Sequence, residues 1–153
     1  IPLLPLLLFC WLTSAQKIPF RNYTVRDNLP SNIVSDIEQD SKGFIWFGTQ
    51  AGAVRFDGYN MVTYDYGSGL PDNIVEDIFI DSDDQIWIGT EKGGIAVIKD
   101  GKSRTINTEN GLLSNNSKTI FQDKSGNIWD ISNIGLSKIT KDTIINFDES
   151  NSP

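Results

Sequence analysis

The sequence predicts an all-β protein built of about three four-stranded antiparallel units, and two features of the chain support this fold class. One stretch recurs at a spacing of about 41 residues, and each copy holds short apolar runs separated by glycine and aspartate turns. Beyond residue 15 no segment keeps a 3.6-residue apolar period, so we expect no helices in the core.

The repetition is strong enough to define structural units. Residues 29–56 match residues 70–97 without a gap, with 14 of 28 positions identical, and a weaker third copy begins at residue 112. Three positions of each copy keep spacings of 41 and 42 residues: Leu29, Leu70 and Leu112; Asp40, Asp81 and Asp123; Trp46, Trp87 and Trp129. Such tandem similarity indicates one supersecondary unit stacked several times.

Each copy predicts four short strands. In the first copy, residues 33–39 alternate loosely between apolar and polar side chains, and residues 44–49 are continuously apolar until Gly48. Residues 53–56 and 61–64 supply the third and fourth strands, with an Asp-Gly hairpin signal between them. A strand that is apolar on both faces must be covered on both faces, and a β-propeller covers each blade with two neighbours.

The length of the repeat favours a propeller over other repeat folds. Four-stranded propeller repeats run to ~40–45 residues, whereas leucine-rich repeats take only ~20–29. Closed propellers need ~4–8 blades, so we expect this chain to be a partial propeller, a fragment of a larger ring. We assign a leading strand to residues 16–28 and repeats to residues 29–69, 70–111 and 112–153, and we expect the third repeat to be truncated at its C-terminal end.

Residues 1–15 have the features of a signal peptide. An apolar run ends at Leu12, and the small residues that follow suit cleavage before Gln16. The run is shorter than the ~20 residues that span a bilayer. An initiator Met and a positive region are missing, so we expect an N-terminally truncated signal; the alternative is a longer signal anchor that has lost its front end. Cys10 is interpreted as an apolar residue of the signal.

The composition argues against several classes of function. The net charge is −7, with no cluster of Lys and Arg, which disfavours nucleic acid as a partner. Histidine is absent, so the commonest general base and transition-metal ligand are missing. The single cysteine allows no disulfide within the chain. We therefore expect no catalytic residue, no metal ligand and no cofactor in this segment.

The repeated motif resembles the two-component regulator propeller repeat. Its pattern is Leu-Pro-x-Asn-x-Val-x-x-Ile, followed by Asp-x-x-Gly-x-Ile-Trp-x-Gly-Thr and a further glycine, and it lies at residues 29–52 and 70–93. The second copy departs from the pattern at Asp84, where the turn glycine would be. The third copy departs further, with Asn116 and Ser117 in place of Ile-Val and residues 130–132 in place of the apolar-Gly-Thr end.

The resemblance implies an extracytoplasmic sensor domain of a membrane histidine kinase. It implies a location on the periplasmic side of the bacterial inner membrane, a membrane-anchored homodimeric parent, and a small-molecule or oligosaccharide ligand. Kinase activity would belong to the parent chain and not to this segment. Two alternatives stay open, namely an exported propeller enzyme of the lyase or glycosidase type and a passive protein-interaction propeller.

Several residues invite a chemical role, but each has a simpler structural explanation. Residues 40–43, 81–84 and 123–126 could be calcium loops or aspartate boxes, and the second is the densest in carboxylate. We favour turns, in which Asp caps the following amides. The three repeated tryptophans could stack on sugars, but their strand context favours core packing. We interpret Gly48-Thr49 and Gly89-Thr90 as a bulge or turn that leaves the strand.

No ligand-binding residue is assigned from the sequence. Asp36 and Asp77 are repeat-equivalent and would lie in different blades, so we do not interpret them as the acid and base of a glycosidase. Binding sites on rigid scaffolds tend to lie on connecting loops, which makes residues 65–73 and 108–116 the candidate loops. Plain connection is the alternative for both loops.

Overall fold

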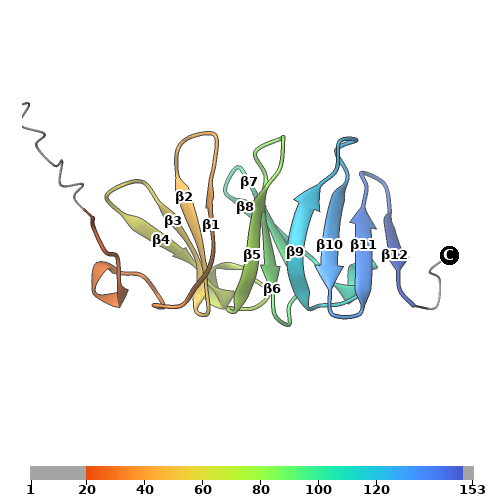
Figure 1. The fold of residues 1–153 in the computed structure, drawn as a ribbon, viewed down its shortest axis with the longest axis horizontal. Helices are drawn as coiled ribbons and strands as arrows, with labels where there is room; N and C mark the ends of the chain where they lie inside the picture. The colour runs from red at the N-terminus through yellow and green to blue at the C-terminus, as the bar shows by residue number, and fades with distance from the viewer. Residues whose placement is uncertain (1–19, 150–153) are drawn as a thin grey trace, which may run out of the picture.

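The computed structural model describes residues 20–149, which form three four-stranded antiparallel sheets, and we call each sheet a blade. Figure 1 shows the blades side by side in chain order. The first blade comprises β1 (Val34–Gln39), β2 (Ile45–Thr49), β3 (Gly52–Phe56) and β4 (Met61–Tyr64). The second comprises β5 (Val75–Ile80), β6 (Ile86–Thr90), β7 (Ile95–Lys99) and β8 (Lys102–Ile106). The third comprises β9 (Ser117–Gln122), β10 (Ile128–Ser132), β11 (Gly135–Ile139) and β12 (Ile144–Phe147). The predicted all-β class and partial propeller are confirmed.

Within each blade the strands pair in chain order, and the blades meet most closely at their first strands. β5 lies against β1 on one side and against β9 on the other. The fourth strands β4, β8 and β12 lie at the opposite edge of each blade. This order covers both faces of a blade, because one face packs on the blade before it and the other on the blade after it.

The core lies between blades. Trp46 of the first blade is buried in an apolar cluster with Ile78 and Ile88 of the second blade. Trp87 of the second blade is buried in the next cluster with Ile120 of the third. Both tryptophans are only 3% exposed, which confirms the prediction that they pack in the core. Each cluster draws on two blades, so a single blade could not bury its own apolar surface.

The third tryptophan lies on the face of the third blade that has no neighbour among the described residues. Trp129 is half-buried and stacks on Phe121 and Phe147, with ring centroids 6.2 and 5.7 Å apart. Its position in the blade is the same as that of Trp87, so the difference in burial reflects the missing neighbour and not a different local fold.

The glycines of the Gly-Thr pairs lie inside β2 and β6, which corrects the interpretation of these pairs as a bulge or turn that leaves the strand. The register shift falls on the partner strands instead, between Val34 and Asp36 in β1 and at the equivalent place in β5. A methyl group at Gly89 would lie 2.6 Å from Ser117 Oγ of the next blade. Glycine therefore permits close approach of the blades.

The leading strand that the sequence predicts at residues 16–28 is wrong for its described part. Residues 20–24 lie in no strand, and η1 (Val25–Asp27) is one turn of 3₁₀ helix. The physical reason is that these residues have no strand beside them to complete a hydrogen-bonded ladder. The same turn recurs before the other two blades as η2 (Tyr66–Ser68) and η3 (Thr108–Asn110). The predicted signal peptide, residues 1–15, lies outside the described residues. Within residues 20–149 no helix is long and apolar enough to span a bilayer.

The two end faces of the stack predict self-association of the isolated segment. Ile37 on the first blade is 58% exposed and Phe147 on the third is 37% exposed, and each belongs to a face that packs on a neighbour elsewhere in the stack. Because the two faces are complementary through the repeat, we expect copies to associate head to tail, as heterologous interfaces do.

Light scattering on a size-exclusion column checks this expectation. The isolated segment should elute as oligomers, and the double variant Ile37→Lys/Phe147→Lys should shift the population towards monomer. Tyr59→Lys is the matched control, since Tyr59 is exposed on a turn away from both faces. A wild-type segment that stays monomeric at every concentration would contradict the expectation.

Candidate functional site

The Asp turns that open the second strands are built the same way in all three blades. Asp40 Oδ1 accepts hydrogen bonds from the backbone N–H groups of Lys42 and Phe44, both at 3.0 Å. Asp40 Oδ2 accepts from the indole Nε1 of Trp46 at 3.0 Å. The prediction that the aspartate caps the turn is confirmed. The bond to the tryptophan was not predicted, although the fixed spacing of six residues between the two was its signal.

The hydrogen bond between the turn aspartate and the tryptophan, which we call the Asp–Trp clamp, recurs in the other blades. It accounts for the repeated Asp–Trp pair. Trp87 Nε1 donates to Asp81 Oδ2 at 2.8 Å, and Trp129 Nε1 donates to Asp123 Oδ2 at 3.0 Å. Hydrogen bonds from Asn127 and Trp129 hold the pKa of Asp123 well below its usual range. A buried indole N–H needs an acceptor, and the turn carboxylate supplies it.

In residues 81–84, considered above for calcium, the carboxylates of Asp81 and Asp84 are engaged by other partners. Both oxygens of Asp81 accept N–H donors, among them the side-chain Nε2 of Gln85 at 2.8 Å. Asp84 reaches the preceding blade, where its Oδ1 accepts from the backbone N–H of Ser41 at 3.0 Å. That hydrogen bond from Ser41 lowers the pKa of Asp84. The described residues contain no group of three metal-ligating side chains.

Removing one clamp tests its contribution to stability. Asp81→Ala leaves the buried Trp87 indole and two turn amides without their acceptor, so we expect it to lower the free energy of unfolding by roughly 2–4 kcal/mol. Asp83→Ala is the matched control, because Asp83 is exposed in the same turn. Chemical denaturation followed by tryptophan fluorescence measures both variants. An equal loss for the two would contradict the assignment.

The two candidate loops, residues 65–73 and 108–116, are held by their own hydrogen bonds. Each begins with a 3₁₀ turn that carries a reciprocal capping box, formed by Asp65 with Ser68 and by Asn107 with Asn110. The asparagine of the Leu-Pro-x-Asn motif closes each loop: Asn73 Oδ1 accepts from Tyr66 N at 2.7 Å. This asparagine therefore has a structural role in the loop, which sequence reasoning missed.

Hydrogen bonds from carboxylates join neighbouring blades at their first strands. Asp36 Oδ2 accepts from the backbone N–H of Ile78 at 2.9 Å, and Asp77 Oδ2 accepts from that of Ile120 at 2.7 Å. Burial raises the pKa of Asp77 to about 6. The hydrogen bond from Ile120 lowers this pKa, and the negative charges of Asp36 and Glu38 raise it. The two aspartates lie in different blades, as predicted, and each binds backbone of the following blade.

The third blade carries a buried polar pair where the second blade has apolar side chains. Ser117 takes the place of Val75, and Asp130 takes the place of Ile88. Ser117 Oγ donates to Asp130 Oδ1 at 2.5 Å, and both residues are fully buried. Burial raises the pKa of Asp130 to about 6; the Ser117 hydrogen bond lowers it, and the charge of Asp77 raises it. The sequence showed both departures but did not reveal that they are partners.

These raised pKa values predict the pH dependence of stability. Between the usual carboxyl pKa of 3.8 and about 6, the folded state binds more protons than the unfolded state. The free energy of unfolding should therefore rise as the pH falls from 7 through 6 towards 4. It should fall again below pH 3.8, since there the lowered pKa of Asp123 favours the unfolded state.

The variant Asp130→Asn should remove part of the rise, on the order of 2 kcal/mol, and should be at least as stable as the wild type at pH 7. Asp100→Asn, on an exposed turn, is the control that should leave the profile unchanged. Denaturant unfolding at several pH values measures all three proteins. A wild-type profile that is flat between pH 4 and 7 would disprove the expectation.

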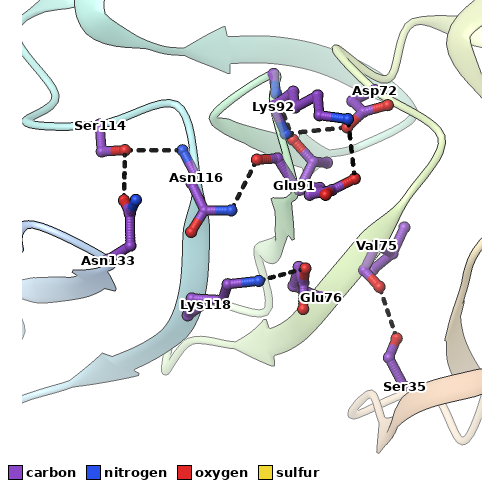
Figure 2. A network of polar contacts seen from close by, with 12 residues as sticks. Ser35, Asp72, Val75, Glu76, Glu91, Lys92, Ser114, Asn116, Lys118 and Asn133 are labelled. Atoms are coloured by element: carbon purple, nitrogen blue, oxygen red, sulfur yellow. Dashed lines mark hydrogen bonds and ion pairs between the residues drawn. The ribbon is translucent and has the colours of Figure 1, made fainter.

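Figure 2 shows polar contacts that link neighbouring blades at their first strands and at the loops beside them. Lys118 of the third blade pairs with Glu76 of the second at 2.5 Å. Asn116 Nδ2 donates to the backbone carbonyl of Glu91 at 2.9 Å. Ser35 Oγ of the first blade donates to the carbonyl of Val75 at 2.7 Å. These contacts fix the relative positions of adjacent blades, and we assign them a structural role.

A groove lies between the second and third blades, and its walls come from both. It has a volume of about 940 Å³. The side chains of Trp87 and Arg104 line one wall, residues 139–144 of the hairpin between β11 and β12 line the other, and residues 110–111 close one end. Its dimensions suit a small-molecule ligand.

Comparison with known proteins supports the resemblance found in the sequence. The family model of the two-component regulator propeller matches residues 28–51 and 69–92. A histidine kinase P4 from Formosa agariphila is 42% identical over 45 residues, which span 29% of this chain and 3% of that protein. The resemblance to two-component regulator propeller repeats is thereby confirmed for two of the three units.

Solved structures resemble a much longer part of the chain. The extracellular domain of a hybrid two-component system from B. thetaiotaomicron superposes with a TM-score of 0.80 at 27% identity, over 90% of this chain and 20% of that one. A second such domain gives a TM-score of 0.67 at 25% identity, over 78% and 19%. A streptogramin B lyase gives 0.60 at 19% identity, over 81% and 43%, which shows the fold alone. The chain therefore spans about a fifth of these two extracellular domains.

Proposed function

Because residues 28–51 and 69–92 are two-component regulator propeller repeats, we propose that this segment is part of the extracytoplasmic sensor of a two-component receptor. The observation that carries the proposal is the match over 90% of the chain to the extracellular domain of a hybrid two-component system. In the proposed receptor, the histidine kinase lies elsewhere in the parent chain, and this segment performs no chemistry.

The described residues support a binding role over a catalytic one. The turn aspartates are occupied by backbone amides and indoles, and the first-strand aspartates by the backbone of the next blade. Ser117 and the carboxylate to which it donates a hydrogen bond, Asp130, are both fully buried, so a substrate does not reach the serine hydroxyl. The likeness to lyases rests on the fold and carries no catalytic residue onto this chain.

In the proposed mechanism, a carbohydrate-type ligand binds on the periplasmic side of the inner membrane. Ligand binding favours one of two arrangements of a homodimeric receptor, and the kinase domains respond to the arrangement. A ligand can shift this equilibrium only as far as its affinities for the two arrangements differ. A stack of blades joined by buried contacts is suited to transmit such a rigid-body change.

The complete reading frame and a phosphorylation assay test the proposal together. We expect a membrane-spanning helix and a histidine kinase core beyond this segment. In membranes that hold the full protein, added oligosaccharide should change the incorporation of labelled phosphate from ATP, and a receptor without residues 29–149 should not respond. A reading frame that lacks both the membrane helix and the kinase core would refute the proposal.

A further inference from the structure

The gaps between successive blades are equivalent through the repeat, yet they leave different amounts of space. The gap between the first and second blades leaves about 80 Å³ on the side away from the first strands, whereas the gap between the second and third leaves about 940 Å³. Both gaps share a turn aspartate and a buried tryptophan on one wall and two isoleucines on the other: Asp40, Trp46, Ile86 and Ile98; Asp81, Trp87, Ile128 and Ile139. The difference must come from the remaining positions.

Four side chains narrow the first gap: Phe44, Arg55, Tyr64 and Asp84. The ring of Phe44 lies under the guanidinium of Arg55, 4.6 Å from ring centroid to Cζ. The ring of Tyr64 packs on Trp46, with centroids 5.4 Å apart. Asp84 reaches across from the second blade to the backbone N–H of Ser41.

Each of these four positions holds a smaller or shorter group in the second gap. The strand registers and the repeat spacing align Phe44 with Gln85, Arg55 with Val97, Tyr64 with Ile106, and Asp84 with Gly126. Gln85 folds back onto Asp81 Oδ2, so it does not fill the space that a phenyl ring would occupy. These four substitutions explain why the second gap leaves more space than the first.

The groove is independent of what covers the ends of the stack. Both of its walls belong to described residues of two adjacent blades. A further blade would pack on the free face of the first or of the third blade and would leave this gap as it is. The groove therefore differs from the apolar end faces, whose exposure depends on a missing neighbour.

The rim of the groove carries both hydrogen-bond donors and hydrogen-bond acceptors. Arg104 lies over the Trp87 ring at 5.5 Å, and within residues 20–149 neither it nor Lys141 forms an ion pair. Asp83 and Asp142 are exposed on the same rim, and their carboxylates accept no hydrogen bond from the described residues. Isoleucine side chains form the floor. A ligand matched to this rim has many hydroxyl groups, which both donate and accept, and no net charge.

We propose that the groove between the second and third blades binds a neutral saccharide, of which one or two rings lie along β8 and the hairpin between β11 and β12. This inference rests on the proposed function in taking the ligand to be a saccharide, and it adds the place of binding and the neutral character of the ligand. Arg104 and Asp142 act as the donor and acceptor on opposite walls.

Groove-filling substitutions test the site. Gly126→Asp places the side chain of Asp84 at the equivalent turn position, where φ is +85° and the added Cβ would meet only Gln122 Nε2, at 3.9 Å. Asp84 itself adopts φ of +58°, so aspartate tolerates this conformation in the same turn. Gly43→Asp is the matched control, since Gly43 holds the same turn position in the first blade, at φ of +86°, and lines neither gap.

Isothermal titration of the full-length receptor, in detergent or membrane vesicles, measures the affinity for cellotriose, xylotriose, mannotriose and galactotriose, with trigalacturonate as the charged comparison. We expect at least one neutral trisaccharide to bind more tightly than trigalacturonate. The double variant Gly126→Asp/Ile106→Tyr should weaken that binding about tenfold or more, and Gly43→Asp should leave it unchanged. Arg104→Ala, with Lys102→Ala as its control on the same strand, gives a second measurement if the double variant is unstable.

The outcomes separate this inference from the proposed function. Saccharide binding that survives both groove variants overturns the site and leaves the sensor function standing. Tighter binding of trigalacturonate, or no binding of any neutral trisaccharide, overturns the inferred ligand, while the reading frame and the phosphorylation assay still decide the sensor function. Loss of binding in Gly43→Asp as well as in the groove variants would also contradict the assignment.

Discussion

The structure depends on sheets that are apolar on both faces and must therefore be covered on both. Ile88 is completely buried against the first blade, while Trp87, its neighbour in β6, is buried against the third. No blade can satisfy this requirement alone, so the stack is the smallest stable unit. The Asp–Trp clamps, the close approach at Gly89 and the aspartate bonds to the next blade all serve this contact.

Much of this arrangement could be predicted from the sequence because it repeats. The period fixed the blades, the Trp spacing located the second strand of each, and the Asp turns were placed correctly with their capping role. The leading strand at residues 16–28 was the clear failure in the described part. This strand was predicted from its place ahead of the first repeat, but a strand also needs a partner, and local sequence does not reveal whether one lies beside it.

The candidate site could not be predicted, since it arises from differences between repeats in three dimensions. Gln85 and Gly126 are unremarkable residues on their own, and they matter only because Phe44 and Asp84 fill the equivalent places in the neighbouring gap. The alignment of Tyr64 with Ile106 depends on the strand registers, since Gly48 pairs with the fifth residue after it whereas Gly89 pairs with the sixth. Repeats are informative for the fold through what they share and for binding through where they differ.

The pair formed by Ser117 and Asp130 has a consequence for how such chains can evolve by recombination between repeats. A crossover that joined the start of the second repeat to the end of the third would bury the Asp130 carboxylate beside a valine, without its donor. The two residues lie only 13 positions apart, so most exchanges between repeats would transfer both. Exchanges between repeats are therefore tolerated where they keep the two residues together.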